Sequence, residues 1–162
     1  MPEEMQPTRK GLRWKQFDYN SQNAYFLTIC TLERKSILST ISIGSTGTPE
    51  VALSDYGEAV ERCILSINKT GYAKVDHYVI MPDHVHLIIC VRKSDHNVTT
   101  LANQTVPHVV STFKRFCRKE IGAAIFQRSY FDHVIRDRED YERRMKYIYD
   151  NPIKSFYEGK YD

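Results

Sequence analysis

The feature that most constrains the fold of this chain is a pair of strand-like runs separated by only two turn-forming residues. Residues 74–81 tend to alternate between apolar and polar side chains, Pro82 and Asp83 interrupt the pattern, and residues 84–91 form an apolar run. Alternation with a period of two is typical of a β-strand, and a short break of this kind favours a tight hairpin. Strands joined by a tight turn pair in antiparallel fashion, so an antiparallel sheet is predicted at the centre of the fold.

Strand and helix patterns follow one another on both sides of this hairpin. Further strands are expected at residues 24–31, 41–43, 51–53 and 129–135. Helices are expected after the N-capping residues Ser54 and Asp137 and along the apolar stripe 109–117, with Pro107 in a first turn and Pro152 as a stop. This order predicts an α+β fold, an antiparallel β-sheet with helices packed on one face, close to the split βαβ arrangement.

The length and composition are those of an ordinary globular protein. A chain of 162 residues suits one domain, which we expect at residues 21–155, between a polar, basic N-terminal arm (1–20) and a C-terminal tail (156–162). Four separated cysteines without a CxxC pair, a polar N-terminus and no apolar stretch of membrane-spanning length predict a cytoplasmic protein with no membrane partner. The formal net charge of +3 is mild and decides little by itself.

Two histidines at the start of the second hairpin strand suggest a metal site. Residues i and i+2 of a strand point to the same face, so His84 and His86 are predicted to project side by side. Two neutral imidazoles on one rigid strand make half of a divalent-metal site whose other positions stay open for catalysis. The alternative is one polar residue at a strand end and one buried core histidine, and the pair alone leaves both interpretations open.

The last helix carries a tyrosine away from its apolar stripe. At 100° per residue the stripe of this helix consists of Tyr141, Met145, Ile148 and Pro152. Tyr147 lies off this stripe, four residues before Asn151, on the flank that carries Asp140 and Arg144. A tyrosine on a polar flank can present its hydroxyl to a site, although packing at an amphipathic helix edge explains the same position.

Four segments of the chain, in this order, resemble one protein family. They are residues 25–31, 81–89, 127–136 and 147–152. The chain resembles the REP-associated tyrosine transposases, which belong to the single-tyrosine HUH group called transposase IS200-like. The histidine pair and the Tyr-x-x-x-Asn-Pro element are short, but their order and their separation of about sixty residues make the combination specific. The resemblance implies a ferredoxin-like or RRM-like HUH nuclease fold.

The resemblance also implies roles for individual residues. His84 and His86 match the metal ligands of the family, and Asn151 stands where a side chain can complete the coordination of Mg²⁺ or Mn²⁺. Tyr147 matches the nucleophile, which attacks a phosphate of single-stranded DNA and releases a 3′-hydroxyl. The resulting 5′-phosphotyrosine link is later attacked by such a hydroxyl to rejoin strands. The implied activity is that of a metal-dependent tyrosine transposase acting in DNA transposition.

The chain departs from the family pattern at two positions. Asp83 replaces the usual Asn, and Phe126 stands where Trp is common. A carboxylate at position 83 would either tighten metal binding or repel the phosphate. His133 lies in the Asp-His-x-Ile-Arg stretch of the family, and no role follows for it from the resemblance.

The expected partner is single-stranded or hairpin DNA. Basic residues supply charge for its backbone, and exposed aromatic rings such as Tyr130 stack unpaired bases. The predicted nucleic-acid-binding residues are Arg13, Trp14, Lys114, Arg115, Arg118 and Arg144. Each basic cluster taken alone is equally a solvated helix face. A homodimer and a monomer are both compatible with the resemblance.

Three other functions compete with the transposase interpretation. A domesticated relative would bind structured nucleic acid without cutting it, and the loss of a histidine or of Tyr147 would favour it, but all three are present. Hydrolysis of a small phosphoester by a metal would not need Tyr147. A structural zinc site is the weakest alternative, because no cysteine partners the histidine pair in a zinc-binding motif.

Overall fold

The computed structural model describes residues 22–92 and 98–161, so the expected N-terminal arm, with Arg13 and Trp14, lies outside the described residues. The elements in chain order are β1 (Gln22–Cys30), η1 (Leu32–Arg34), β2 (Ser39–Ile43), β3 (Pro49–Leu53), α2 (Asp55–Ser66), η2 (Ile67–Lys69), β4 (Ala73–Ile80), β5 (His84–Arg92), α3 (Val98–Ile121), β6 (Phe131–Ile135) and α4 (Arg138–Tyr157). The expected strands and helices are all present. The last strand begins two residues later than expected.

Four strands form one antiparallel sheet in the order β4-β5-β1-β6, and β2 pairs with β3 as a separate two-stranded hairpin. The hairpin predicted from the sequence is formed by β4 and β5, which pair in antiparallel fashion and are joined by the turn that contains Pro82 and Asp83. The order follows the split βαβ arrangement, because β1 lies between β5 and β6, which come later in the chain. The α+β prediction with an antiparallel sheet is therefore confirmed.

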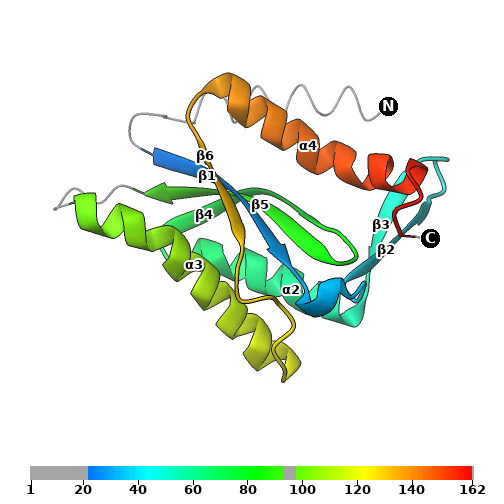
Figure 1. Cartoon of the computed structure of the whole chain (residues 1–162), viewed down its shortest axis with the longest axis horizontal. Coiled ribbons are helices and arrows are strands. Elements are labelled where there is room, and N and C mark those ends of the chain that lie inside the picture. The colour runs from blue at the N-terminus through cyan, green and yellow to red at the C-terminus, as the bar shows by residue number, and fades with distance from the viewer. Residues whose placement is uncertain (1–21, 93–97, 162) are drawn as a thin grey trace.

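Helices cover both faces of the four-stranded sheet, so the expectation of one covered face was wrong. Figure 1 shows α2 and α3 on one side and α4 on the other. Successive side chains of a strand point to opposite faces. In β1 and β5, Leu27 and Leu87 join the core cluster that includes residues of α2 and α3, whereas Phe26 and Ile88 join the cluster that includes residues of α4. The nearly continuous apolar run of β5 reflects this burial on both faces.

The two prolines that were expected near helix ends lie inside helices. Helix α3 begins at Val98, well before Pro107, and α4 continues to Tyr157 beyond Pro152. A proline inside a helix removes one hydrogen bond and costs about 3 kcal/mol. Burial of Ile148, Pro152 and other residues of α4 offsets that cost, so tertiary packing decides where the helix ends. Within residues 22–92 and 98–161, we find no helix with the length and apolar character needed to cross a membrane.

The N-cap of α2 is formed as predicted and offers a test of local stability. The Ser54 hydroxyl oxygen accepts a hydrogen bond from the Gly57 backbone N–H at 3.1 Å. We expect Ser54→Ala to lower the free energy of unfolding by about 1 kcal/mol in urea titrations, because this N–H loses its partner. Ser66→Ala removes an exposed hydroxyl later in the same helix and should change stability by less than about 0.5 kcal/mol. Equal effects of the two changes would contradict the capping role.

Candidate active site

The predicted histidine pair lies at the start of β5, on the sheet face that α4 covers. The Nε2 atoms of His84 and His86 approach each other to 3.0 Å, and the two residues are only 3% and 5% exposed. Two ligand atoms held at right angles by metal bonds of about 2.1 Å would be about 3.0 Å apart. The spacing and the chemistry of the two donors therefore fit a divalent cation.

Neighbouring oxygens hold both imidazole rings. His84 Nδ1–H donates to Asp83 Oδ1 at 2.6 Å, which leaves its Nε2 lone pair available. The Thr28 hydroxyl lies 2.8 Å from His86 Nδ1, across the β1-β5 register in which Thr28 faces His86. Such partners on the far nitrogen orient metal-binding histidines and fix their tautomers. The arrangement keeps both Nε2 atoms pointed at one place.

Burial keeps the imidazoles neutral, which is the form that binds metals. Loss of water around His86, together with the nearby His84, lowers the pKa of His86 to about 3. Burial also lowers the pKa of His84, although the hydrogen bond and charge of Asp83 oppose the effect. A neutral imidazole can bind a metal ion directly, whereas a protonated imidazole must first lose a proton.

Asp83, one of the two residues that depart from the family pattern, supports His84. Burial would raise the pKa of this carboxyl, but hydrogen bonds with His84 and Tyr161, with the charge of Arg34, bring it below its ordinary value. Arg34 Nε lies 2.9 Å from Asp83 Oδ2, and the Tyr161 hydroxyl donates to Oδ1 at 2.7 Å. A carboxylate neutralised in this way is suited to raising the basicity of His84, and the ion pair weakens its repulsion of a phosphate.

Tyr147 of α4 lies against the histidine pair. Its ring centroid is 5.2 Å from that of His86 and 5.9 Å from that of Phe26, both in edge-on contacts. Phe26 stacks in turn on His86 at 5.1 Å. Tyr147 nevertheless remains 46% exposed, so its side chain is accessible from solvent. Of the other tyrosines of this region, Tyr141 is buried in the core and the Tyr149 hydroxyl contacts His77 Nδ1 at 3.0 Å. The Tyr161 hydroxyl is committed to Asp83 and lies 3.5 Å from His84 Nδ1, the ring nitrogen that faces away from His86.

Asn151, the predicted third ligand, follows Tyr147 by about one helical turn. It is buried, and its side-chain oxygen accepts a hydrogen bond from the Ser155 hydroxyl at 3.1 Å. Among the described residues, no group of three or more His, Cys, Asp or Glu side chains is placed to share a metal ion. A metal at His84 and His86 would therefore use oxygen donors of another kind, and the Asn151 amide is of that kind.

A second group of polar residues, whose arrangement the sequence did not reveal, lies beside Tyr147. His133 of β6 has its Nε2 2.7 Å from Asp140 Oδ2, and the guanidinium groups of Arg143 and Arg144 both lie 3.6 Å from Asp140 Oδ1. An open pocket of about 720 Å³ runs between β6 and α4. It is lined by Asp132, His133, Val134, Arg136, Asp137, Asp140, Arg143, Arg144 and Tyr147. The motif Asp-His-x-Ile-Arg was visible in the sequence, but its partner Asp140 was not.

The ion pair of Asp140 predicts a dependence of stability on pH. Burial would raise its pKa, but the hydrogen bond from His133 and the charges of His133 and the two arginines lower it below the unfolded value. The contribution of the ionised Asp140 carboxylate to the free energy of unfolding is therefore complete above the ordinary aspartate pKa of about 3.9. It is lost as the pH falls through the lower pKa that Asp140 has in the folded protein. We expect the difference in unfolding free energy between the parent and Asp140→Asn to shrink as the pH falls from 5 to about 2 in urea titrations. A constant difference would show that the charge is unimportant.

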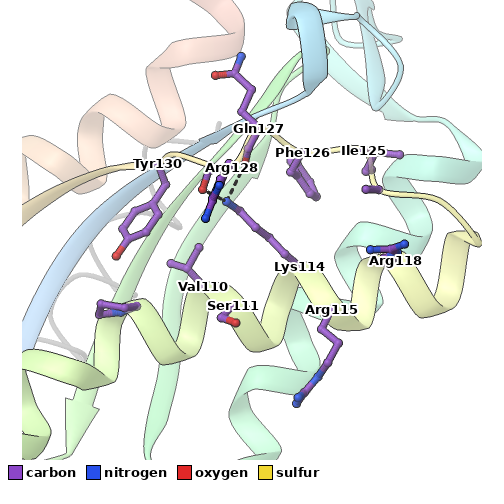
Figure 2. Close-up of a pocket in the computed structure, with 12 residues that line it drawn as sticks. Val110, Ser111, Lys114, Arg115, Arg118, Ile125, Phe126, Gln127, Arg128 and Tyr130 are labelled. Carbon is purple, nitrogen blue, oxygen red and sulfur yellow. Dashed lines mark hydrogen bonds between the residues drawn. The ribbon is translucent and has the colours of Figure 1, made fainter.

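The basic residues predicted on α3 lie on the opposite face of the sheet from Tyr147. Lys114, Arg115 and Arg118 line a pocket of about 460 Å³ between α3 and residues 124–130 (Figure 2). The Lys114 ammonium donates to the carbonyl oxygens of Gln127 and Arg128 at 2.6 and 2.8 Å, so it also holds this loop. Its ammonium lies 5.7 Å from the ring centroid of Tyr130, the aromatic residue expected to stack on bases. Arg144 is separate from this group.

Comparison with known proteins agrees with this architecture. A protein of Haemophilus influenzae (strain ATCC 51907 / DSM 11121 / KW20 / Rd) without assigned function is 30% identical over 164 residues, which cover 90% of this chain and 88% of that protein. The REP-associated tyrosine transposase of Escherichia coli (strain K12) is 23% identical over 97 residues, 60% of this chain and 54% of that protein. A solved structure of a REP-associated tyrosine transposase bound to a REP hairpin has the same fold, with a TM-score of 0.59, 19% identity and coverage of 85% of this chain and 71% of that one. The family model "Transposase IS200 like" matches residues 48–151, and the chain belongs to this family of transposases.

Proposed function

We propose that this transposase cleaves and rejoins structured single-stranded DNA through a covalent link to Tyr147. The observation that carries the proposal is the 5.2 Å contact between the rings of Tyr147 and His86, which come from segments about sixty residues apart. A half-exposed tyrosine beside a pair of neutral, convergent imidazoles is an arrangement that suits phosphoryl transfer. Family membership supports DNA as the substrate.

The proposed reaction is a transesterification. The Tyr147 oxygen attacks the phosphorus, so that the oxygen–phosphorus bond forms as the bond from phosphorus to the 3′ oxygen of the neighbouring nucleotide breaks. The phenolic proton leaves to solvent, and the released 3′ oxygen ends as a hydroxyl. The reverse attack by a 3′-hydroxyl restores a phosphodiester, and the number of phosphoester bonds stays constant. No external energy source is needed.

The residues around Tyr147 divide the work of this reaction. Phe26 and His86 hold the tyrosine ring by edge-on contacts, which limits the orientations of its hydroxyl. A divalent cation, Mg²⁺ or Mn²⁺, held by His84, His86 and Asn151 would offset negative charge on the attacked phosphate. Asp83 keeps His84 in the tautomer that such a cation requires.

The DNA would reach the protein on both faces of the sheet. The pocket of Arg115, Arg118 and Tyr130 combines positive charge with an aromatic ring, the combination that binds nucleic-acid backbones and unpaired bases. The pocket beside Tyr147 lies on the other face. We infer that a folded DNA element occupies the α3 face while a single strand passes Tyr147. The solved relative bound to a REP hairpin supports a hairpin as the folded element.

Covalent trapping tests this function directly. We would incubate the protein with end-labelled hairpin oligonucleotides from the flanks of its own gene, with Mn²⁺, Mg²⁺ or EDTA, and separate the products on denaturing gels. The expected result is a metal-dependent protein–DNA adduct with single-stranded probes and none with the same sequence as a perfect duplex. Tight hairpin binding without any adduct would instead identify a nucleic-acid-binding relative that has lost cleavage. Hydrolysis of small phosphoesters without an adduct would point to the metal hydrolase.

A further inference from the structure

The pocket between β6 and the first half of α4 has no role in the steps described above, although Tyr147 forms part of its wall. We propose that this pocket binds one DNA phosphate next to the phosphate that Tyr147 attacks, with Arg144 and His133 as the groups that contact it. The inference rests on the proposed function, because it concerns the DNA strand that Tyr147 cuts. It adds a specific phosphate site in a pocket that Tyr147 lines and whose lining includes neither His84 nor His86.

The position of Arg144 carries the inference. Its guanidinium carbon lies 5.1 Å from the ring centroid of Phe26, the same ring that contacts Tyr147. Stacking on a ring leaves the five N–H donors of an arginine free in the plane of the guanidinium group. Asp140 approaches Arg144 Nε to only 3.6 Å, longer than a good hydrogen bond, so this carboxylate restrains the group and leaves its donors for a ligand. Arg144 is thus held beside the nucleophile with donors to spare.

His133 presents a second donor or acceptor to the same pocket. It faces Phe26 across the β1-β6 register, and its Nε2 is fixed by Asp140 at 2.7 Å. Nδ1 is then the ring nitrogen left for another partner, and the side chain is 33% exposed. Asp140 is a positioning residue here, because it holds both His133 and Arg144 and is itself buried.

The charges of the pocket indicate one phosphate and argue against a long backbone track. Its three arginines are matched in number by three aspartates among the lining residues. Asp137 Oδ1 caps the helix by accepting from the Asp140 N–H at 2.8 Å, and Asp140 is committed to His133 and the arginines. Asp132 is exposed at the pocket wall, so the lining carries little excess positive charge. A locally arranged pair of donors without large excess charge favours recognition of a single anion over general attraction to DNA.

The test is a double-mutant cycle between the protein and individual DNA phosphates. All proteins carry Tyr147→Phe, so that binding is measured without cleavage, and the probes are fluorescein-labelled single-stranded hairpins from the flanks of the gene. Each probe replaces one phosphate by an uncharged methylphosphonate. At one position in the DNA, the methylphosphonate is expected to weaken binding to the protein that retains Arg144 about tenfold. Arg144→Gln is expected to weaken binding of the unmodified probe about tenfold. The two changes together should weaken binding little more than either change alone, because both remove the same contact.

Matched variants separate contact from general charge. Arg138→Gln removes one guanidinium from the same helix outside the pocket and should leave the methylphosphonate effect at about tenfold. Arg144→Lys keeps the charge but loses the planar fork, so an intermediate coupling is expected. His133→Gln should reduce coupling at the same phosphate.

The outcomes distinguish this inference from the proposed function. The parent protein could form the Tyr147 adduct while Arg144→Gln and Arg138→Gln respond alike to every methylphosphonate. That result would refute the proposed phosphate site and leave the proposed nuclease activity supported. If no probe binds or forms an adduct, both fail. Coupling confined to Arg144 and His133 at one phosphate near the cleaved bond would support the site.

Discussion

Tyr147→Phe is expected to abolish the covalent protein–DNA adduct, with a loss of about a thousandfold or more in its rate of formation. The change removes only the attacking oxygen. The ring that contacts His86 and Phe26 remains, so folding and DNA binding should persist. Adduct formation is measured on denaturing gels with single-stranded hairpin probes, and binding is measured separately by fluorescence anisotropy.

Tyr149 provides a matched control on the same helix. It is 41% exposed against 46% for Tyr147, and its hydroxyl contacts His77, which belongs to β4. Tyr149→Phe should form adduct within about twofold of the parent, because its oxygen is not expected to touch the DNA phosphate. An adduct that survives Tyr147→Phe and is lost in Tyr149→Phe would reverse the assignment. If both variants lose the adduct but still bind DNA, adduct formation depends on the structure of α4 as a whole and not on the Tyr147 oxygen alone.

Removing either imidazole is expected to eliminate specific binding of Mn²⁺ and, with it, the adduct. In the parent, Mn²⁺ at about one hundred times its dissociation constant should stabilise the fold by about 2.7 kcal/mol, since the ion binds the native state. His84→Ala and His86→Ala each leave a single imidazole, so the rise in Tm with added Mn²⁺ should vanish. Calorimetric titration with Mn²⁺ gives the affinity without any need for DNA.

His108→Ala is the control for this experiment. His108 lies in α3, on the other face of the sheet, where its ring contacts Tyr72. This variant should bind Mn²⁺ and form adduct like the parent. Far-UV circular dichroism checks that the buried His84 and His86 variants remain folded. Unchanged Mn²⁺ affinity in folded His84→Ala and His86→Ala would refute the metal site.

Local patterns in the sequence predicted the elements that depend on local forces. The alternation of 74–81 and the break at Pro82 identified the β4-β5 hairpin, and Ser54 and Asp137 cap their helices as expected. Caps and strand periodicity involve residues within a few positions of one another, so they are readable from sequence. Predictions that depend on distant packing were less successful. Pro107 and Pro152 fall inside helices, and helices cover both faces of the sheet.

The candidate site divides in the same way. That His84 and His86 share one face follows from the strand period, and their Nε2 atoms do converge. For Tyr147 the residue pattern alone left packing at a helix edge as an alternative, and the contact with His86 places it at the site. The role of Tyr147 as nucleophile and the roles of His84, His86 and Asn151 as metal ligands stay predictions. The support of His84 by Asp83, and the unit of His133, Asp140 and Arg144, appear only in the folded chain.

The sequence by itself determined the α+β class, the antiparallel hairpin and the resemblance to IS200-like transposases, because these rest on short-range patterns and on ordered motifs. Tertiary structure decided that the ring of Tyr147 lies against His86 and which charged residues surround it. Those contacts join β1, β5, β6 and α4, whose separation along the chain leaves no periodic signal. They arise when α4 packs on Phe26 and Ile88, since burial of that apolar face fixes where its polar flank can lie.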